Sequence, residues 1–291
     1  MQISILKTLP EFHGKKIRFK GNLKGGITNK NYKIQVEEKK YAVRNMSLQT
    51  EPLRIDRQSE FGACELAWRQ GVAPKPIAYL PEHHLMIFEF IEGTPIPPKI
   101  IKTFKYLVKI IKAIKKYHHA GQVPARFCVF ETIESYKQKA MERGVPFPDY
   151  FPQVERKIKT LKKKVASLDK PEFQNKLCHN DLLNANFLKK KSDKKIMILD
   201  WEYAGMGNLF FDLANFSSHH ELNNRQDLEM LTLYFDGQVS SRTLELLNHM
   251  KLLSLAREAM WGLLQCGLSE LNFDYRNYTR IFFKRFLESQ K

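Results

Sequence analysis

The sequence predicts an α+β fold with two closely packed lobes, a small β-rich N-terminal lobe followed by a larger and mainly helical lobe. At 291 residues the chain exceeds one average domain. Short β-rich segments, separated by glycine, asparagine and charged residues, occupy its first third. Most of the remainder repeats apolar residues at helical spacing. We therefore expect the N-terminal lobe at residues 1–92 and the C-terminal lobe at residues 93–291.

The N-terminal lobe is expected to contain strands around one helix. The helix is predicted over residues 57–70, where Phe61, Cys64 and Trp68 form one stripe and Gly71 marks the end. The segment before the last strand is broken by two prolines. The strands are predicted at residues 17–20, 32–36, 41–44 and 85–90.

The C-terminal lobe is expected to be built from helices. Residues 242–265 and 275–287 have helical periodicity near the end of the chain. Residues 127–152 carry three prolines and are expected to be an irregular link between helices. Earlier in this lobe, a stripe of apolar residues at helical spacing is expected to lie in the hydrophobic core. Its members are Ile100, Ile101, Phe104, Leu107, Val108, Ile111 and Ile114.

The formal net charge of +17 raises the question of an anionic partner. The excess is concentrated in residues 102–116 and 156–176, where lysines alternate with apolar residues at helical spacing. Solvated helix faces are the preferred interpretation, with attraction of phosphate-rich substrates or loose contact with acidic lipid as alternatives. The sequence contains no zinc finger, RNP-like aromatic motif or other recognised nucleic-acid module. We therefore expect no nucleic-acid partner.

A cytoplasmic location is expected from the absence of targeting and membrane signals. No apolar run approaches the roughly 20 residues that a membrane-spanning helix needs, so stable membrane insertion is not expected. The first residues lack the features of a signal peptide. The four cysteines are widely spaced without a C-x-x-C pair, which suits a reduced compartment.

Residues 177–215 carry the strongest functional pattern. Asp181 lies in a His-x-Asp loop, Asn186 follows five residues later, and Asp200 ends a short apolar run that is typical of a buried strand. Protein kinases transfer phosphoryl groups with such a set, an Asp that orients the hydroxyl and an Asn and an Asp that hold Mg²⁺. Single residues of these types mostly serve turns, but the spacing of all three together favours a phosphotransferase.

Within this stretch, HNDLLNAN, ILDWEYAG and FDLAN resemble the choline/ethanolamine kinase family and its bacterial relatives. The wider group includes aminoglycoside phosphotransferases and thiamine kinase. The resemblance covers nearly the whole chain and implies a protein-kinase-like fold, with a nucleotide-binding N-terminal lobe and a catalytic and substrate-binding C-terminal lobe. It also implies ATP- and Mg²⁺-dependent phosphorylation of a small alcohol.

The same resemblance implies roles for individual residues. Asp181 is the expected catalytic base, with His179 and Asn186 beside it in the catalytic loop. Asn186 and Asp200 are the expected Mg²⁺ ligands, and Glu202 is expected close to the metal. These roles require the loop after one strand and the end of the next strand to meet at one point.

Three regions of the N-terminal lobe are expected to hold ATP. Arg44, in YAVR, stands where protein kinases place a phosphate-binding lysine, and Glu60 is preferred to Glu65 as its partner. A second region, GGITNKNY, resembles the nucleotide loop of choline kinases, and glycine lets backbone N–H groups approach phosphate. The residues of that loop are Gly25, Gly26, Thr28 and Asn29. The hinge expected to bind adenine comprises Glu89, Phe90 and Ile91.

Aromatic residues in the last third are candidates for binding a cationic substrate through cation–π attraction. Taken alone they favour core packing, but WGL…Q followed by F-x-Y-x-x-Y is similar to the end of choline kinases, where such residues line the choline pocket. Leu264 stands where many of these enzymes have a second Trp, and His219 where they commonly have Glu, for which Glu221 is a candidate replacement. The candidates are Trp261, Tyr275 and Tyr278.

Choline is the first expected substrate, with ethanolamine and thiamine as alternatives. An aminoglycoside is less favoured, because a polycation prefers an acidic cleft and this chain is strongly basic. A hypothesis of another class is a non-catalytic kinase-like protein that binds anionic lipid or nucleic acid. The presence of Asp181, Asn186 and Asp200 together argues against it.

Overall fold

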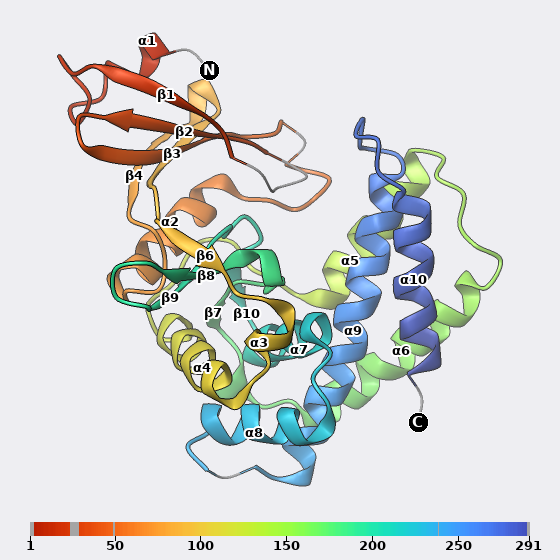
Figure 1. Ribbon diagram of the computed structural model, residues 1–291. Helices are drawn as coiled ribbons and strands as arrows, with labels where there is room; N and C mark the ends of the chain where they lie inside the picture. The colour runs from red at the N-terminus through yellow and green to blue at the C-terminus, as the bar shows by residue number, and fades with distance from the viewer. Residues whose placement is uncertain (1–2, 24–28, 49, 238, 290–291) are drawn as a thin grey trace.

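A five-stranded antiparallel sheet forms the N-terminal part of the protein, in the order β1-β2-β3-β5-β4 (Figure 1). The computed structural model describes residues 3–23, 29–48, 50–237 and 239–289. The four predicted strands are present, and a fifth, over residues 76–80, was not predicted. The strands are β1 (Ile17–Asn22), β2 (Lys30–Val36), β3 (Lys39–Asn45), β4 (Pro76–Leu80) and β5 (Leu85–Glu89).

One face of this sheet carries a small hydrophobic core. Ile34, Val43 and Ile87 come from three neighbouring strands and are fully buried. They pack with Leu6 of α1 (Ile3–Leu6) and with Phe12. Because successive side chains of a strand point to opposite faces, these alternate apolar positions are enough to place the core on one side.

Helix α2 (Arg57–Arg69) follows the third strand and begins at Asp56, whose side chain accepts a hydrogen bond from Ser59 N at 2.6 Å. Cys64 is buried, as the predicted stripe requires, but Trp68 remains 36% exposed. Trp68 therefore lies at the surface rather than in the core, and Lys75 Nζ lies 5.4 Å from the centroid of its ring.

The C-terminal part is mainly helical, which confirms the expected α+β class with a β-rich N-terminal part. Helix α9 runs through its centre, and four other helices, α5, α6, α7 and α10, pack around it (Figure 1). The helices are α3 (Pro98–Ile101), α4 (Phe104–His118), α5 (Val129–Glu142), α6 (Phe151–Leu168), α7 (Leu209–His220), α8 (Asn224–Tyr234), α9 (Ser241–Gln265) and α10 (Tyr275–Glu288).

Two small sheets connect the N-terminal sheet to the helices. β6, β8 and β9 form a three-stranded antiparallel sheet, and β7 pairs with β10. The loop of residues 179–186 therefore leaves one small sheet and enters the other. The strands are β6 (Gly93–Pro95), β7 (Lys176–Cys178), β8 (Phe187–Lys190), β9 (Ile196–Ile198) and β10 (Gly205–Gly207), with short 3₁₀ turns at Pro81–His83, Pro171–Phe173 and Asn184–Asn186.

Two expectations for the helical part were wrong. Residues 127–152 are not an irregular link throughout, because α5 lies within them and buries Ile133, Tyr136 and Ala140 at helical spacing against α9. The expected core stripe is also divided. Leu107, Ile111 and Ile114 are buried with Ile101, whereas three other members of the stripe face solvent: Ile100, Phe104 and Val108 are exposed by 41%, 58% and 38%. Within the described ranges, no helix is long and apolar enough to cross a membrane.

Candidate active site

A cavity of about 210 Å³ lies between the N-terminal sheet and the helical part. Its wall includes Arg44 of β3, Glu60 of α2 and the segment Glu89–Ile91 that follows β5. Its opposite wall includes Asn186 and Asp200. The cavity therefore contains most of the described residues expected to bind the nucleotide and the metal ion.

The loop after β7 is held in place by Asp212, a fully buried carboxylate of α7. Asp212 accepts hydrogen bonds from the backbone N–H of His179 at 2.8 Å and of Asn180 at 2.7 Å. The hydroxyl of Tyr117 at 2.6 Å and His118 Nε2 at 3.1 Å complete its shell. Burial acts to raise the pKa of Asp212, but the hydrogen bond from His118 and the neighbouring groups outweigh it and lower the pKa below its ordinary value.

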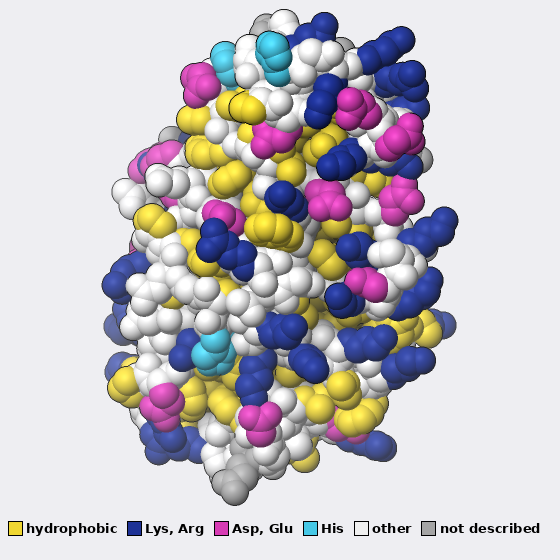
Figure 2. Space-filling model, turned by 90° about the vertical axis from the view of Figure 1, so that its left-hand side faces the viewer, with side chains coloured by type: hydrophobic (Ala, Val, Ile, Leu, Met, Phe, Trp, Pro, Cys, Tyr) yellow, Lys and Arg dark blue, Asp and Glu magenta, His cyan; other side chains and the backbone are white. Residues whose placement is uncertain are grey.

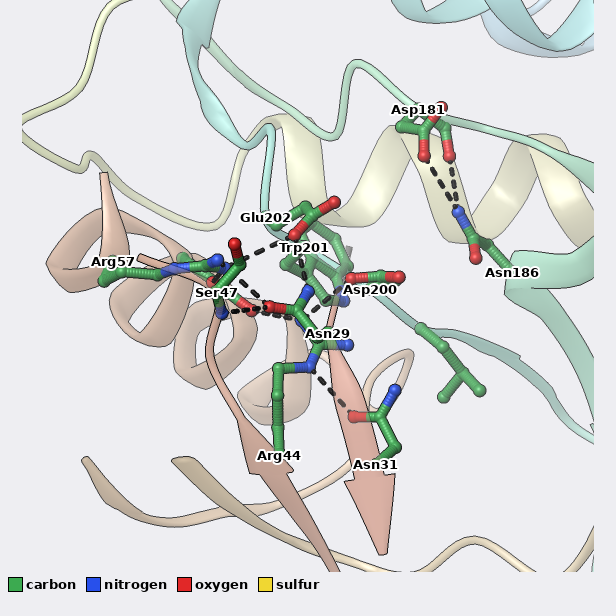
Figure 3. Close-up of polar contacts among 12 residues, drawn as sticks. Asn29, Asn31, Arg44, Ser47, Arg57, Asp181, Asn186, Asp200, Trp201 and Glu202 are labelled. Carbon is green, nitrogen blue, oxygen red and sulfur yellow. Dashed lines mark hydrogen bonds and ion pairs between the residues drawn. The ribbon is translucent and has the colours of Figure 1, made fainter. Parts of the chain in front are cut away.

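The loop itself brings Asp181 and Asn186 together (Figure 3). Asn186 Nδ2 donates to the backbone carbonyl of Asp181 at 2.8 Å and lies 3.4 Å from its carboxylate. His179 does not face the cavity, since its Nδ1 lies 3.3 Å from Asp181 N and its Nε2 lies 2.9 Å from Leu199 O. This buried imidazole joins the loop to the end of β9, and burial lowers its pKa, which favours the neutral form.

Arg44 links the two walls of the cavity. Its Nη1 lies 2.5 Å from Glu60 Oε1 and 2.8 Å from Asp200 Oδ1. The expected partner, Glu60, is therefore present, whereas Glu65 pairs with Arg69 on the helix surface. Burial alone would lower the pKa of Arg44, but Asp200 and Glu60 raise it, so the guanidinium is firmly charged. Asp200 adopts a left-handed backbone, with φ of 64°.

Glu202 belongs to a second buried network beside this pair (Figure 3). Its Oε2 accepts from Asn29 Nδ2 at 2.8 Å and lies 3.3 Å from Arg57 Nη1. Arg57 also contacts Glu60 at 2.6 Å and Asn29 Oδ1 at 3.1 Å. Burial, followed by the Asp200 charge, raises the pKa of Glu202 to about 6. Arg57 was not singled out from the sequence. Gly25, Gly26 and Thr28 lie outside the described residues.

Two backbone N–H groups of the hinge segment, residues 89–91, are hydrogen-bonded to neighbouring strands of the sheet or the residues beside them. Glu89 N–H donates to Lys75 O at 2.8 Å, and Phe90 N–H donates to Lys40 O at 3.0 Å. All three residues, Glu89, Phe90 and Ile91, line the cavity. The hinge donors of Glu89 and Phe90 are thus engaged within the protein.

On the other side of Asp181, α9 contributes a buried charged pair that the sequence analysis missed. Arg257 and Glu258 are 1% and 3% exposed, and the Arg257 guanidinium lies over the Tyr203 ring at 4.5 Å. Arg257 Nη1 lies 2.5 Å from Glu258 Oε1 and 3.8 Å from Asp181 Oδ1. Burial raises the pKa of Asp181 well above its ordinary value, against the opposing effect of Arg257.

Glu258 is also in contact with two other helices. Its Oε2 accepts a hydrogen bond from the Tyr278 hydroxyl at 2.8 Å, and its Oε1 lies 3.6 Å from His219 Nε2. Burial acts to raise its pKa, but Arg257, His219 and Tyr278 hold it well below the ordinary value, so Glu258 is ionised. Glu221, the residue suggested as a replacement for the family glutamate, instead lies at the surface, with a side chain 71% exposed near Arg285. Sequence proximity to His219 was misleading, because a helix end turns Glu221 outward.

The three aromatic candidates lie together but are closely packed. The Trp261 ring centroid lies 6.0 Å from Tyr275 and 5.8 Å from Tyr278, both in edge-to-face geometry. Trp261 Nε1 donates to the Tyr203 hydroxyl at 2.9 Å, and its side chain is 9% exposed. The aromatic cluster therefore contacts the Arg257–Glu258 pair through Tyr203 and Tyr278.

Comparison with known proteins gives a consistent result. The family model for choline/ethanolamine kinase matches residues 21–229. Ethanolamine kinase 2 of Rattus norvegicus is 27% identical over 96% of this chain and 78% of the relative. The probable ethanolamine kinase A of Dictyostelium discoideum is 27% identical over 92% of this chain and 84% of the relative.

Solved structures agree with the sequence relatives. The choline kinase LicA of Streptococcus pneumoniae is 26% identical, with a TM-score of 0.81 and coverage of 98% of both chains. The spectinomycin phosphotransferase APH(9)-Ia has a TM-score of 0.60 at 16% identity, which shows a shared fold alone. The resemblance found in the catalytic stretch is thus confirmed: the chain belongs to the choline/ethanolamine kinase family and is a small-molecule kinase with an aminoglycoside phosphotransferase-like fold.

Proposed function

We propose that this kinase transfers the γ-phosphoryl group of ATP to the hydroxyl of ethanolamine and that choline, the first expectation from the sequence, is the weaker substrate. The observation that supports ethanolamine best is the buried, ionised carboxylate of Glu258 beside Asp181. The curated relatives named above are ethanolamine kinases, which favours the same choice. Choline remains the second candidate because of the similarity to LicA and the aromatic cluster.

The chemistry of the two ammonium groups differs in hydrogen bonding. A primary ammonium offers three N–H donors, whereas a trimethylammonium offers none and is held mainly by aromatic faces. Oxygens of Glu258 already accept from Arg257 and Tyr278, so a primary ammonium can continue this pattern. The edges of Tyr275 and Tyr278 pack around Trp261, which leaves little aromatic surface free for three methyl groups.

Mg²⁺ prefers oxygen ligands in octahedral geometry. Asn186 and Asp200 both line the same cavity and both carry side-chain oxygens, and this donor set fits the ion. We therefore propose that these two residues hold Mg²⁺ on the ATP phosphates. Glu202 is engaged by Asn29 and Arg57, so its proposed role is to position these groups beside the metal site.

In the proposed reaction Asp181 accepts a hydrogen bond from the ethanolamine hydroxyl and orients it toward the γ-phosphorus. The new O–P bond forms as the bond to the β-phosphate oxygen breaks, ADP leaves, and the hydroxyl proton passes to Asp181. The raised pKa of Asp181 suits this acceptor role. Arg44 supplies a charged guanidinium to the phosphates, and Ile91 is the proposed hinge contact of adenine.

The test is turnover of ATP by the purified protein with Mg²⁺ and ethanolamine, choline or thiamine in parallel. We expect the highest kcat/KM with ethanolamine. Asp181→Asn is expected to abolish turnover while ATP binding persists, whereas Asp193→Asn, in the exposed turn between β8 and β9, is the matched control. A higher kcat/KM with choline or thiamine would overturn the substrate assignment, and full activity of Asp181→Asn would overturn the catalytic one.

A further inference from the structure

Helices α3 and α4 carry a line of apolar side chains on the outside of the molecule. Ile100, Phe104 and Val108 are exposed by 41%, 58% and 38%, and they follow one another at intervals of four residues. Residues four apart on a helix lie on the same face, so Phe104 and Val108 form a stripe along α4, and Ile100 lies on the short preceding helix α3, on the other side of the extended residue Thr103. Isolated exposed apolar residues are common, but an aligned set indicates a surface with a function.

Lysines flank this stripe. Lys105, Lys109 and Lys112 are exposed on α4, and none of them forms an ion pair with an acidic side chain in the described part of the chain. Residues 93–130 contain seven lysines, one arginine and no aspartate or glutamate. Figure 2 shows the side of the molecule on which α4 lies, where Lys and Arg side chains outnumber acidic ones and hydrophobic side chains lie between them.

The opposite face of α4 is occupied by the fold itself. Leu107, Ile111 and Ile114 are buried in the main core, and Tyr117 supports Asp212 beneath the catalytic loop. The outward face contributes nothing to that loop or to the cavity wall. Its lysines and apolar residues are therefore explained neither by packing nor by phosphoryl transfer.

We propose that this α4 face, defined by Ile100, Phe104, Val108, Lys105, Lys109 and Lys112, binds reversibly to the surface of an anionic lipid bilayer. Lysines near such a surface are attracted to the acidic headgroups, and this attraction decreases with added salt. The apolar stripe enters the interfacial region, as in amphipathic helices that lie in the membrane plane. In this proposal the enzyme is held at the membrane surface by this face of α4.

A bilayer fits these observations better than a nucleic acid. Phosphate backbones are bound by basic side chains alone, or with aromatic side chains that stack on bases. Aliphatic Ile100 and Val108 cannot stack on bases, but they can be buried among acyl chains. The helix α6 offers a comparison within the same protein, because its exposed lysines, such as Lys159 and Lys163, are not accompanied by a large exposed apolar residue of α6.

Vesicle flotation tests the proposal, with vesicles of phosphatidylcholine alone or mixed with phosphatidylserine. We expect the full chain to float only with the mixed vesicles and to be released by salt. Lys105→Glu with Lys109→Glu is expected to weaken binding at least about tenfold. Lys159→Glu with Lys163→Glu makes the same change in net charge on α6 and is expected to leave binding within about twofold.

A second pair of variants tests the apolar stripe. Phe104→Ser with Val108→Ser is expected to weaken binding without any change in charge, whereas Met141→Ser with Ile281→Ser removes two apolar side chains exposed elsewhere and is expected to have little effect. Turnover of the soluble substrate and the circular dichroism spectrum should be unchanged in all four double variants, which separates membrane binding from catalysis and from folding.

Three results would overturn the proposal. The first is an absence of flotation with phosphatidylserine vesicles. The second is an equal loss of vesicle binding from the charge reversals on α4 and on α6, which would mean that binding depends only on net charge. The third is tighter binding to an RNA or DNA duplex that the lysine variant loses and the Phe104/Val108 variant keeps, which would identify a nucleic-acid surface instead.

Discussion

Glu258→Gln removes one negative charge from the side of the site where we propose that the alcohol substrate binds, while it keeps the size of the side chain. In the wild-type protein the carboxylate is 3% exposed and lies between Arg257 and Tyr278. The proposed ammonium of ethanolamine forms charge-assisted hydrogen bonds with it. A bond of this type contributes about 1.5–3 kcal/mol and a neutral one about 0.5–1.5 kcal/mol.

The substitution leaves a hydrogen bond from the charged ammonium to a neutral amide oxygen, which is weaker by at most the difference between the two classes, about 1–1.5 kcal/mol, and it also removes the longer-range attraction between opposite charges. We expect kcat/KM for ethanolamine to fall by about a hundredfold, since every 1.4 kcal/mol corresponds to a factor of ten. Choline loses the charge attraction but has no hydrogen bond to lose. The ratio of kcat/KM for ethanolamine to that for choline should thus fall by about five- to tenfold.

The assay is steady-state ATP turnover with each alcohol, for the wild type, Glu258→Gln and a control. Glu245→Gln is the control, because Glu245 lies on the same helix with a side chain 57% exposed and pairs only with His249 among the described residues. An unchanged ratio of the two kcat/KM values would refute the reasoning, because it would mean that the substrate ammonium does not contact Glu258. Unchanged kcat/KM values for both ethanolamine and choline would mean that the alcohol substrate binds away from Glu258.

Three further predictions concern other parts of the structure. Arg44→Lys loses the planar fork that reaches both Glu60 and Asp200, and we expect the KM for ATP to rise about tenfold while the protein remains folded. Burial lowers the pKa of His220 to about 3, so the folded state excludes a proton that the unfolded state binds. The free energy of unfolding should therefore fall as pH decreases from 6.5 towards 3, by up to about 5 kcal/mol. His220→Gln should remove this part of the pH dependence, as measured by urea titrations at several pH values. Gly262→Ala places a Cβ about 2.7 Å from Thr279 Oγ1, and we expect it to destabilise the α9–α10 contact by about 1–3 kcal/mol in thermal unfolding.

Each of these variants has a matched control in the same protein. Arg69→Lys changes an arginine on the surface of α2 and should leave the KM for ATP unchanged. Ser218→Ala, a change near the C-terminal end of the helix that carries His220, removes no titratable group and should not change the pH dependence of stability. Gly62→Ala meets Val123 Cγ1 only at 3.6 Å, an ordinary contact, and should be neutral or slightly stabilising because alanine favours a helix. Equal effects of a variant and its control would contradict the structural explanation in each case.

The parts of the site that the sequence predicted are those formed by short, local patterns. Asp181 and Asn186 lie five residues apart in one loop, and Asp200 follows the next strand, so local geometry alone brings their side chains near one another. The ion pair between Arg44 and Glu60 was also anticipated, from a strand followed by one helix.

The parts that were missed or misread depend on which face of a helix is covered. Leu107 and Val108 are adjacent and equally apolar, yet one is buried and the other is 38% exposed. The charged pair in LAREAMWG gave a signal that could have been read, because two charges inside an apolar helix require buried partners. Which partners they have could not be read, since Asp181 and Tyr278 are distant in the chain.

By itself, then, the sequence determined the α+β class, four strands of the N-terminal sheet and the close spacing of Asp181, Asn186 and Asp200, because these follow from periodicity and from spacing within a few residues. Only the tertiary structure decided the chemistry of the acceptor side and of the outer α4 face. Glu258 becomes a candidate for cation binding when α9, α10 and the catalytic loop meet. Burial and contacts between distant segments depend on how the helices pack, and the order of residues in the sequence does not specify that packing directly.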